Sequence, residues 1–355
     1  MSKTTVAVIF GGVSSEHEIS LLSAASVIAN IPTEQYRIFM LGITKEGRWL
    51  LFDGSTDEIK NGTWVQNPHN RTAFLSPDKS VHGIAVQTEQ GIETLYVDVI
   101  FPVLHGKNGE DGTIQGLFAL SGIPFVGCNT LSSAVCMDKA VTNILLTAAG
   151  IAKAEFLWFY ANEYPAQKER IYEEITEKLH GYPVFVKPAN AGSSVGVSKA
   201  KNADELDRAV ALAAKEDKKI VIETCIVGKE VECAVMGNDT PETSVVGEIA
   251  PSAEFYDYED KYKNGTSKVY IPAPLDDQTA QTVRENAVKA YRTLGCSGLS
   301  RIDFFVRESD SAVLLNEINT LPGFTAISMY PMLWEAQGIS YSRLLHRIIQ
   351  FALEQ

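Results

Sequence analysis

The sequence has few cysteines and no long apolar run, and both absences exclude classes of protein. Its five cysteines are odd in number and include no C-x-x-C pair, so they predict neither a disulfide framework nor a zinc ribbon. No run of about 18 apolar residues occurs, and the N-terminal segment lacks the layout of a signal peptide. We therefore expect a cytoplasmic protein that does not span a membrane.

Positive charge is also scarce. The chain has 31 lysines and arginines against 44 aspartates and glutamates, which gives a formal net charge of −13. Proteins that bind nucleic acids or anionic membranes use a basic face to displace counterions from the phosphates. We therefore expect neither kind of partner, and an anionic substrate would need a locally basic pocket.

The two commonest nucleotide-binding signatures are missing as well. The first strand is not followed by G-x-G-x-x-G, and no G-x-x-x-x-G-K-[S/T] occurs, which excludes the dinucleotide-binding fingerprint and the P-loop. The sequence also lacks internal repeats and low-complexity tracts. Its 355 residues, 45% hydrophobic and 21% charged, are typical of a folded protein with two or three domains of about 150 residues each.

Short apolar strands alternate with helices in the first part of the chain. A strand over 5–10, rich in Val and Ile, leads into a glycine pair, and the amphipathic helix that follows begins with a capping box of Ser15 and Glu18. This alternation predicts an α/β domain with a parallel sheet over residues 1–127. Residues 53–95 are rich in Asn, Thr, Ser, Gly and Asp, so we expect surface hairpins or loops there.

The rest of the chain predicts two α+β domains. In the first, a helix over 133–149 precedes strands and a helix that flank a polar, glycine-rich loop. In the second, the strands become antiparallel, with a helix over 278–294 and a hairpin of strands 300–306 and 312–319. The last helix, from residue 341, carries apolar side chains at helical spacing. We place these two domains at 128–226 and 227–355.

The segment KPANAGSSVGVSK has the properties of a phosphate-binding loop. Lys187 ends a buried strand, and residues 191–196 are small enough for backbone N–H groups to approach a phosphate. A glycine- and serine-rich loop also occurs without any ligand. Lys187 favours the phosphate interpretation, because a lysine at a strand end, followed by proline, has little structural reason to be there.

A second group of polar residues lies within two apolar strands. Arg301 and Asp303 are two residues apart, as are Glu317 and Asn319, so the alternation of a strand places each pair on one face. If the strands pair through a turn near residue 310, Asp303, Glu317 and Asn319 converge. Three oxygen ligands without histidine or cysteine suit Mg²⁺. The alternative is a solvated hairpin face with an ordinary surface ion pair.

Seven sequence blocks together resemble one family along nearly the whole chain. The blocks GGVSSEHEIS, LHGKNGEDGTIQG, MDK, VKPANAGSSVG, YDYEDKY, GCSGLSRID and NEINTLPGFT are similar to those of the ATP-grasp D-alanine–D-alanine ligases and stand in the same order. The resemblance implies an α/β and α+β protein with the ATP-grasp fold, in which an N-terminal parallel-sheet domain precedes two α+β domains that grip ATP. It also implies a homodimer.

The family's reaction transfers the γ-phosphate of ATP to the carboxylate of one D-alanine, and the amine of a second D-alanine then attacks the acyl phosphate. By resemblance the cofactors are ATP and two Mg²⁺ ions, with Mn²⁺ as an alternative. Arg301 and the backbone N–H of Gly323 match the pair that stabilises the oxyanion, and Glu16 matches the residue that holds the first ammonium. The implied catalytic residues are Glu16, Ser193, Tyr262, Arg301 and Gly323.

The resemblance assigns further residues to binding. Its implied ATP contacts are Lys139, Lys187, Ser194, Glu223, Thr224, Ile226 and Glu230. Its implied metal ligands are Asp303, Glu317 and Asn319, and its implied substrate contacts are His105, Lys261, Ser328 and Met329. The family usually has a lysine where this chain has Thr224, so the backbone of Thr224 would have to serve the adenine.

Other interpretations of single motifs are weaker. Ser15, His17 and Glu18 do not predict a catalytic triad, because neighbours within one helical turn point apart and triads assemble from distant segments. His17 and His105 lack the spaced partners of a metal site. Residues 254–267 are too polar for a buried strand and too aromatic for a plain linker, which favours a lid that closes over substrate. A packed Ω-loop without function is the alternative.

The leading functional hypothesis is an ATP-dependent ligase that makes D-alanyl-D-alanine for peptidoglycan precursors. A ligase that uses D-serine or D-lactate as its second substrate is the nearest alternative. A non-catalytic ATP-grasp module that only binds nucleotide is the alternative from another class. Arg301 and the metal ligands argue against that module, since a binding protein needs neither an oxyanion donor nor two metals.

Overall fold

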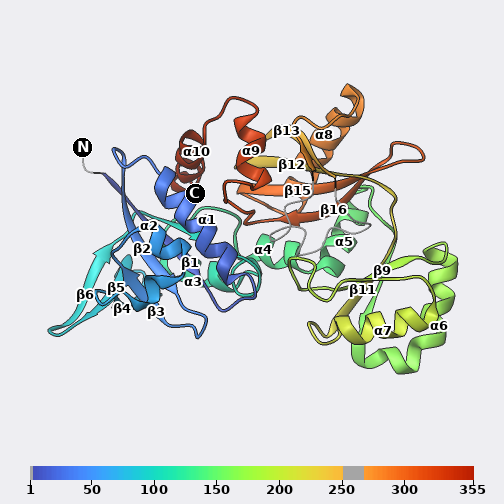
Figure 1. The fold of residues 1–355 in the computed structure, drawn as a ribbon, viewed down its shortest axis with the longest axis horizontal. Helices are drawn as coiled ribbons and strands as arrows, with labels where there is room; N and C mark the ends of the chain where they lie inside the picture. The colour runs from blue at the N-terminus through green and yellow to red at the C-terminus, as the bar shows by residue number, and fades with distance from the viewer. Residues whose placement is uncertain (1–2, 251–267) are drawn as a thin grey trace.

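The computed structural model of the chain describes residues 3–250 and 268–355. Three β-sheets lie along its long axis, and the last of them in sequence lies between the other two (Figure 1). Lys261, Tyr262 and the predicted lid over 254–267 lie outside the described residues. Along the described part of the chain, no helix combines the length and the apolarity needed to cross a bilayer.

The first sheet has seven strands in the order β6-β5-β4-β3-β2-β1-β7. β1 pairs in parallel with β2 and β7, whereas the strands from β3 to β6 add in antiparallel fashion. The predicted parallel sheet is therefore confirmed for three strands only. The strands are β1 (Thr4–Gly11), β2 (Tyr36–Ile43), β3 (Trp49–Phe52), β4 (Arg71–Leu75), β5 (Gly83–Thr88), β6 (Gly91–Tyr96) and β7 (Val99–Val103).

The segment 53–95 forms more than loops. Its hairpin prediction is confirmed by β5 and β6, and β4 extends the sheet between them and β3. The segment also holds α2 (Thr56–Lys60) and the 3₁₀ helix η1 (Thr63–Gln66). Its polar composition has a physical reason, because β6 is an edge strand that is exposed along most of its length.

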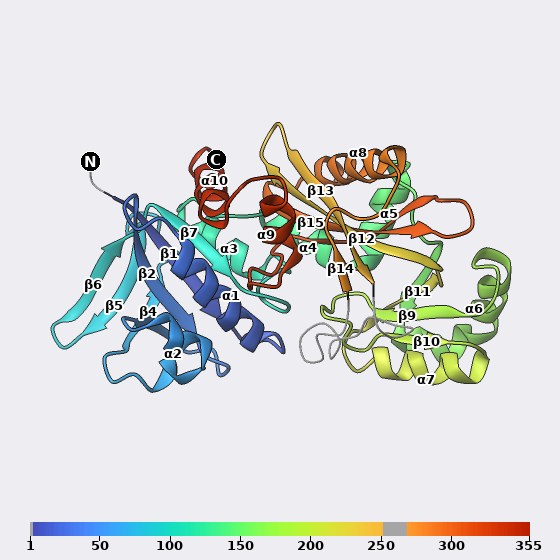
Figure 2. The same ribbon diagram turned by 45° about the horizontal axis from the view of Figure 1, so that its top comes forward.

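Helices from both ends of the chain pack on this sheet. α1 (His17–Asn30) and α10 (Tyr341–Leu353) lie beside each other and share one hydrophobic core with β1 and β7 (Figure 2). α3 (Thr113–Ser121) also belongs to this part of the fold. The predicted capping box of α1 is wrong: the helix begins after Glu16, no side chain caps it, and Glu18 pairs with Lys45 instead.

The second sheet is antiparallel, in the order β10-β9-β11-β8. Two helices complete its core, and the glycine- and serine-rich loop connects β9 to β10. Its elements are β8 (Phe156–Tyr160), the 3₁₀ helix η2 (Ala161–Glu163), α6 (Tyr164–Lys178), β9 (Val184–Pro188), β10 (Ser198–Ala200), α7 (Ala203–Ala213) and β11 (Lys219–Thr224).

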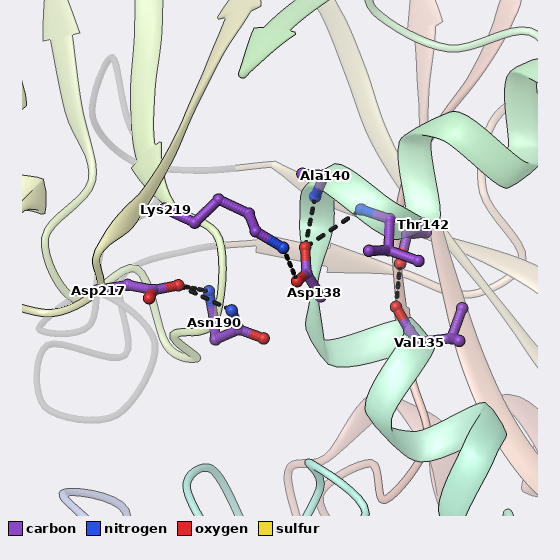
Figure 3. A network of polar contacts seen from close by, with 8 residues as sticks. Val135, Asp138, Ala140, Thr142, Asn190, Asp217 and Lys219 are labelled. Atoms are coloured by element: carbon purple, nitrogen blue, oxygen red, sulfur yellow. Dashed lines mark hydrogen bonds and ion pairs between the residues drawn. The ribbon is translucent and has the colours of Figure 1, made fainter. Parts of the chain in front are cut away.

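The single helix predicted over 133–149 is in fact two helices, α4 (Thr130–Met137) and α5 (Lys139–Ala148). They meet at Asp138, whose backbone is extended. The Asp138 carboxylate accepts hydrogen bonds from the N–H groups of Ala140 and Val141, both at 3.1 Å, and it also pairs with Lys219 at the start of β11 (Figure 3). Helical periodicity does not reveal this break, because the apolar spacing continues across Asp138. The Asp138 side chain acts as an N-cap and satisfies N–H groups at the start of the new helix.

The third sheet is antiparallel, in the order β14-β13-β12-β15-β16. The predicted hairpin and the predicted helix over 278–294 are confirmed. Alternate residues of β12 enter two different cores, so α8 covers one face of the sheet and α9 the other. The elements are β12 (Gly228–Gly237), β13 (Glu242–Ala250), β14 (Lys268–Tyr270), α8 (Asp277–Thr293), β15 (Gly298–Arg307), β16 (Val313–Asn319) and α9 (Met329–Glu335).

Candidate active site

A cavity of about 390 Å³ opens between the second and third sheets. Its lining comes from the start of α5, from β9 and β11, from the glycine- and serine-rich loop, and from β15 and β16. Every residue predicted to contact ATP lines it. The lining includes Lys139, Lys187, Ser193, Ser194, Glu223, Thr224, Ile226, Glu230 and Glu317. Residues spread over much of the sequence are thus brought to one cavity.

A buried ion pair lies in the wall of this cavity. The Lys187 Nζ atom is 2.6 Å from Glu223 Oε2, and the Asn143 amide donates a hydrogen bond of 2.8 Å to Glu223 Oε1. Burial opposes the charged form of Glu223, but the nearby Lys187 ammonium outweighs this effect and lowers the pKa of Glu223. Burial likewise opposes the charge on Lys187, whose pKa is nevertheless raised by Glu223. Both groups are therefore charged at neutral pH.

Lys139, the first residue of α5, is hydrogen-bonded to the start of the glycine- and serine-rich loop. Its Nζ atom donates a hydrogen bond of 2.7 Å to the carbonyl of Ala191, and its backbone N–H donates one of 3.0 Å to the carbonyl of Ala189. Asn190, between them, is tied by two hydrogen bonds to Asp217, which precedes β11 (Figure 3). Burial lowers the pKa of Lys139, although Glu317 acts in the opposite direction.

The loop also reaches the N-terminal domain. The Ser193 hydroxyl donates a hydrogen bond to Glu16 Oε1. A Cβ atom at Gly192 would lie 2.8 Å from Glu16 Oε2, and one at Gly106 would also collide with that oxygen. The Glu16 carboxylate therefore lies between two glycine turns that leave no room for a side chain. Both Ser193 and Ser194 adopt a positive φ, of 49° and 59°.

His105 is buried beside these residues and uses both ring nitrogens. Its Nδ1 atom is 3.1 Å from the carbonyl of Leu321, and its Nε2 atom is 3.2 Å from the Ser23 hydroxyl. Since a carbonyl only accepts, Nδ1 carries the proton and Nε2 accepts from Ser23. Burial lowers the pKa of His105, which favours this neutral form. The ring thus joins α1 to the segment after β16, and its contact with substrate stays a prediction.

The register of β15 and β16 brings the predicted metal ligands together. Asp303 pairs with Glu317, and Arg301 pairs with Asn319. Arg301 donates to both oxygens of Asp303, at 2.8 and 2.7 Å, and lies 2.9 Å from Glu232 of β12. The side chains of Arg301 and Asp303 are only 16% and 13% exposed, so the alternative of a solvated hairpin face is wrong.

These residues fit a magnesium ion. Asn319 donates from Nδ2 to Asp303 Oδ2 at 3.0 Å, which leaves its carbonyl oxygen to act as a ligand. No group of three or more His, Cys, Asp or Glu side chains that could hold a metal occurs within residues 3–250 and 268–355. A Mg²⁺ ion held by the carboxylates of Asp303 and Glu317 and the amide of Asn319 would therefore need further oxygen ligands. Mg²⁺ typically takes these from water and substrate phosphates.

The turn before α9 carries the remaining predicted residues. The Ser328 hydroxyl accepts a hydrogen bond of 2.9 Å from the N–H of Thr325, and a Cβ atom at Gly323 would lie 2.8 Å from that same hydroxyl oxygen. Met329 is 5% exposed and packs against Gly247 in the hydrophobic core. The structure thus gives Met329 a packing role, and its contact with substrate stays a prediction.

Sequence reasoning missed three polar side chains near the site. Asn143 contacts Glu223, as described above. Burial raises the pKa of Glu110 to about 8, and its carboxyl accepts a hydrogen bond of 2.7 Å from the N–H of Gly106. Burial lowers the pKa of Lys153 to about 8, and its Nζ atom lies 3.9 Å from the centre of the Phe156 ring. Asn143 stands one helical turn after Lys139, but this spacing alone does not indicate a contact with Glu223.

The two halves of the chain match two family models, "D-ala D-ala ligase N-terminus" over residues 5–128 and "D-ala D-ala ligase C-terminus" over residues 145–350. The chain belongs to the D-alanine–D-alanine ligase family. A D-alanine–D-alanine ligase of Acetivibrio thermocellus is 50% identical, with 99% of this chain and 96% of the relative covered. One of Ruminiclostridium cellulolyticum is 49% identical, with 100% and 96% covered.

Solved structures of family members have the same fold. The VanG D-Ala:D-Ser ligase from Enterococcus faecalis superposes with a TM-score of 0.90 at 42% identity, covering 99% of this chain and 100% of that one. The D-alanine–D-alanine ligase from Coxiella burnetii has a TM-score of 0.86 at 33% identity, with 99% and 96% covered. The expected D-alanine–D-alanine ligase family and ATP-grasp architecture are thereby confirmed.

Proposed function

We propose that this protein uses ATP to join two D-alanines into D-alanyl-D-alanine for peptidoglycan precursors, with ADP and phosphate as the other products. The observation that carries this proposal is the connection of three parts of the chain at one cavity. Lys139, Lys187 and Glu317 line the cavity together with Ser193 of the glycine- and serine-rich loop. Glu317 pairs with Asp303 in the third sheet, and Ser193 contacts Glu16 of the N-terminal domain.

The cavity fits a nucleoside triphosphate. Lys139 and Lys187 supply positive charge to the phosphates in an otherwise acidic protein. Ser194 belongs to the same phosphate end. Glu223 and the chain at Thr224 and Ile226 face the adenine, and Glu230 faces the ribose.

Asp303, Glu317 and Asn319 would hold two Mg²⁺ ions together with the phosphates. When bound, such ions neutralise the charge on a transferring phosphoryl group and clamp it between attacking and leaving oxygens. Arg301 lies beside Asp303 and is therefore close to the transferred group. Mn²⁺ has similar ligand preferences and is the alternative ion.

The reaction has two steps. A carboxylate oxygen of the first D-alanine attacks the γ-phosphorus, the bond to the β–γ bridging oxygen breaks, and ADP leaves. The amine of the second D-alanine then attacks the acyl carbon, loses a proton, and expels phosphate. Glu16 and Ser193 hold the first ammonium, while Arg301 and the N–H of Gly323 donate hydrogen bonds to the oxyanion, whose stabilisation is usually a large contribution to such catalysis.

The second amino acid is held by residues from two places. We assign its carboxylate to Lys261 and Ser328, with Met329 as a neighbouring contact, whereas His105 lies near Glu16 at the first D-alanine. Tyr262, on the same predicted lid as Lys261, would tie that lid to Ser193 and Glu16. A closed lid would exclude water, which otherwise hydrolyses an acyl phosphate.

D-Alanine is the preferred second substrate because the curated relatives at 47–50% identity are named D-alanine–D-alanine ligases. D-Serine is the first alternative because the VanG D-Ala:D-Ser ligase is 42% identical; D-lactate is another. A module that only binds nucleotide is disfavoured by the buried Arg301 and its carboxylates. We further propose domain boundaries at 127/128 and 226/227, a homodimer, and a cytoplasmic location where ATP is available.

One experiment tests the proposal. The protein is incubated with ATP, Mg²⁺ and D-alanine, alone or with D-serine or D-lactate, and phosphate release and product mass are followed together. We expect phosphate and D-alanyl-D-alanine in equal amounts from D-alanine alone. If phosphate release accompanies a mixed product at higher yield, D-serine or D-lactate replaces D-alanine as the proposed second substrate. Nucleotide binding without phosphate release would favour the non-catalytic module.

A further inference from the structure

Polar contacts at two places join a helix and a strand of the nucleotide cavity, α5 and β11, and Asn143 makes one of these contacts. At one end, Asp138 pairs with Lys219 at the start of β11 (Figure 3), and at the other end Asn143 donates to Glu223 near the end of β11. Ala140 and Val221 pack together between these polar contacts. The face of α5 therefore follows β11, and the position of one element fixes the other.

The same helix face serves both ends of the proposed nucleotide. Lys139 and Asn143 are four residues apart in α5, so their side chains lie on one face. Lys139 contacts the glycine- and serine-rich loop, while Asn143, at 2% exposure, is buried and directs its amide at Glu223. A buried amide of this kind is costly unless it makes its hydrogen bond.

The Glu223 carboxylate is held by a donor on each oxygen. Lys187 is at 2.6 Å from Oε2, and Asn143 is at 2.8 Å from Oε1. An ionised carboxylate only accepts hydrogen bonds, and each oxygen accepts from more than one donor. Glu223 also lines the cavity, so it presents a fixed acceptor to whatever base enters there.

We infer that Asn143 is a positioning residue that aims Glu223 at the 6-amino group of adenine and thereby sets the preference for ATP over GTP. This inference rests on the proposed nucleotide site. Adenine offers N–H donors at its 6-position, whereas guanine offers an oxygen that a carboxylate repels. Without Asn143, the carboxylate is free to turn toward Lys187, and the acceptor is no longer aimed at the base.

The test uses Asn143→Leu, which keeps the approximate size and removes the amide, and Asn143→Asp, which keeps the shape and places a second carboxyl beside Glu223. Thr142→Val is the matched control, because Thr142 is buried in the same helix and donates its hydrogen bond to Val135 rather than to Glu223 (Figure 3). ADP and GDP affinities are measured by calorimetry, and kcat and KM are measured with ATP and GTP.

We expect the Asn143 variants to bind ADP about tenfold more weakly, the loss typical of one hydrogen bond to a charged group. GDP affinity and kcat at saturating ATP should stay within about twofold, so the base preference falls by the same factor. In a Glu223→Ala background, Asn143→Leu should have no further effect on the ADP to GDP ratio, since a positioning residue acts only through its partner.

Unchanged base preference in folded Asn143 variants, or an equal loss in Thr142→Val, would overturn the inference. An Asn143→Leu effect that persists in the Glu223→Ala background would do so as well. If Asn143→Leu does not fold, Asn143→Asp carries the test alone. ADP binding needs no turnover, so this measurement stays decisive even if the protein makes no dipeptide and the proposed reaction fails.

Discussion

Two polar groups, one beside the cavity on the third sheet and one in its wall, differ in how their charges are balanced. On the hairpin of β15 and β16, Arg301 is enclosed by Asp303 and Glu232. On the other side of the cavity, Lys187 of β9 pairs with Glu223, and Lys139 of α5 donates a hydrogen bond to the carbonyl of Ala191. With Glu317 opposite Asp303, the hairpin side combines one cation with three carboxylates and has an excess of negative charge. The lysine side instead combines Lys139 and Lys187 with the buried Glu223, which favours an anion in the cavity. We therefore expect substitutions in the Arg301 group to act mainly on kcat, and substitutions of the lysines to act mainly on ATP binding.

The largest effect is expected from breaking the hairpin group. Arg301→Ala removes an oxyanion donor, and such losses lower kcat by about 10²–10³. ATP affinity should change little, because the lysines remain. Steady-state kinetics and ADP calorimetry measure the two quantities separately. A kcat within twofold of the wild type would remove Arg301 from this role.

A substitution on the lysine side should act mainly on binding and stability. Lys187→Met leaves Glu223 buried without its cation, and breaking such a pair typically costs about 3–5 kcal/mol of unfolding free energy. ATP affinity should fall at the same time. Lys139→Met is the comparison, since its partner is a neutral carbonyl and stability should fall less. Equal denaturation midpoints for both variants would contradict the difference in charge balance.

The contact between the loop and the N-terminal domain should have a smaller effect. Ser193→Ala removes the hydrogen bond to Glu16, which is worth about 1 kcal/mol and predicts a rise in the KM for D-alanine of about fivefold. Ser194→Ala is the control, because Ser194 lines the nucleotide cavity and should change the KM for ATP instead. The opposite pattern would exchange the two assignments.

The smallest effect concerns pH. Because burial raises the pKa of Glu110 from an ordinary 4.5 to about 8, the folded protein binds more protons than the unfolded chain between these values. The contribution of Glu110 to unfolding free energy therefore falls as pH rises through this window. Glu110→Gln, which cannot ionise, should make the melting temperature less dependent on pH between 5 and 8. Glu308→Gln, at an exposed position, is the control and should leave the pH dependence unchanged.

The hairpin group was predictable in part from strand geometry. Alternation places Arg301 and Asp303 on one face, and a short turn leaves few choices of register. Glu317 lies opposite Asp303, however, only because the register shifts between Asp303 and Phe304, and the sequence did not show that shift. The resemblance to a known family supplied the rest of the candidate site. Neither the strand alternation in the hairpin nor the resemblance required knowledge of how distant elements pack.

The misses come from packing between distant elements. Nothing in the local sequence shows that Asp138 ends one helix and starts another, because the apolar periodicity continues across it. Asn143 has meaning only once α5 lies along β11. Met329 stands next to a site residue in sequence, but its side chain is in the core.

The shared core of α10 and β1 affects how the chain can fold during synthesis. Leu344, Leu345 and Ile348 pack in one cluster with Val6 and Val8, and His346 contacts Tyr36 at 2.8 Å. Domains generally fold in the order in which they are synthesised. Here the first sheet and α1 leave the ribosome early, but the apolar face that they share is fully covered only when α10, close to residue 355, has been made. We therefore expect truncation before residue 341 to leave apolar surface exposed on the N-terminal domain and to make it prone to aggregation.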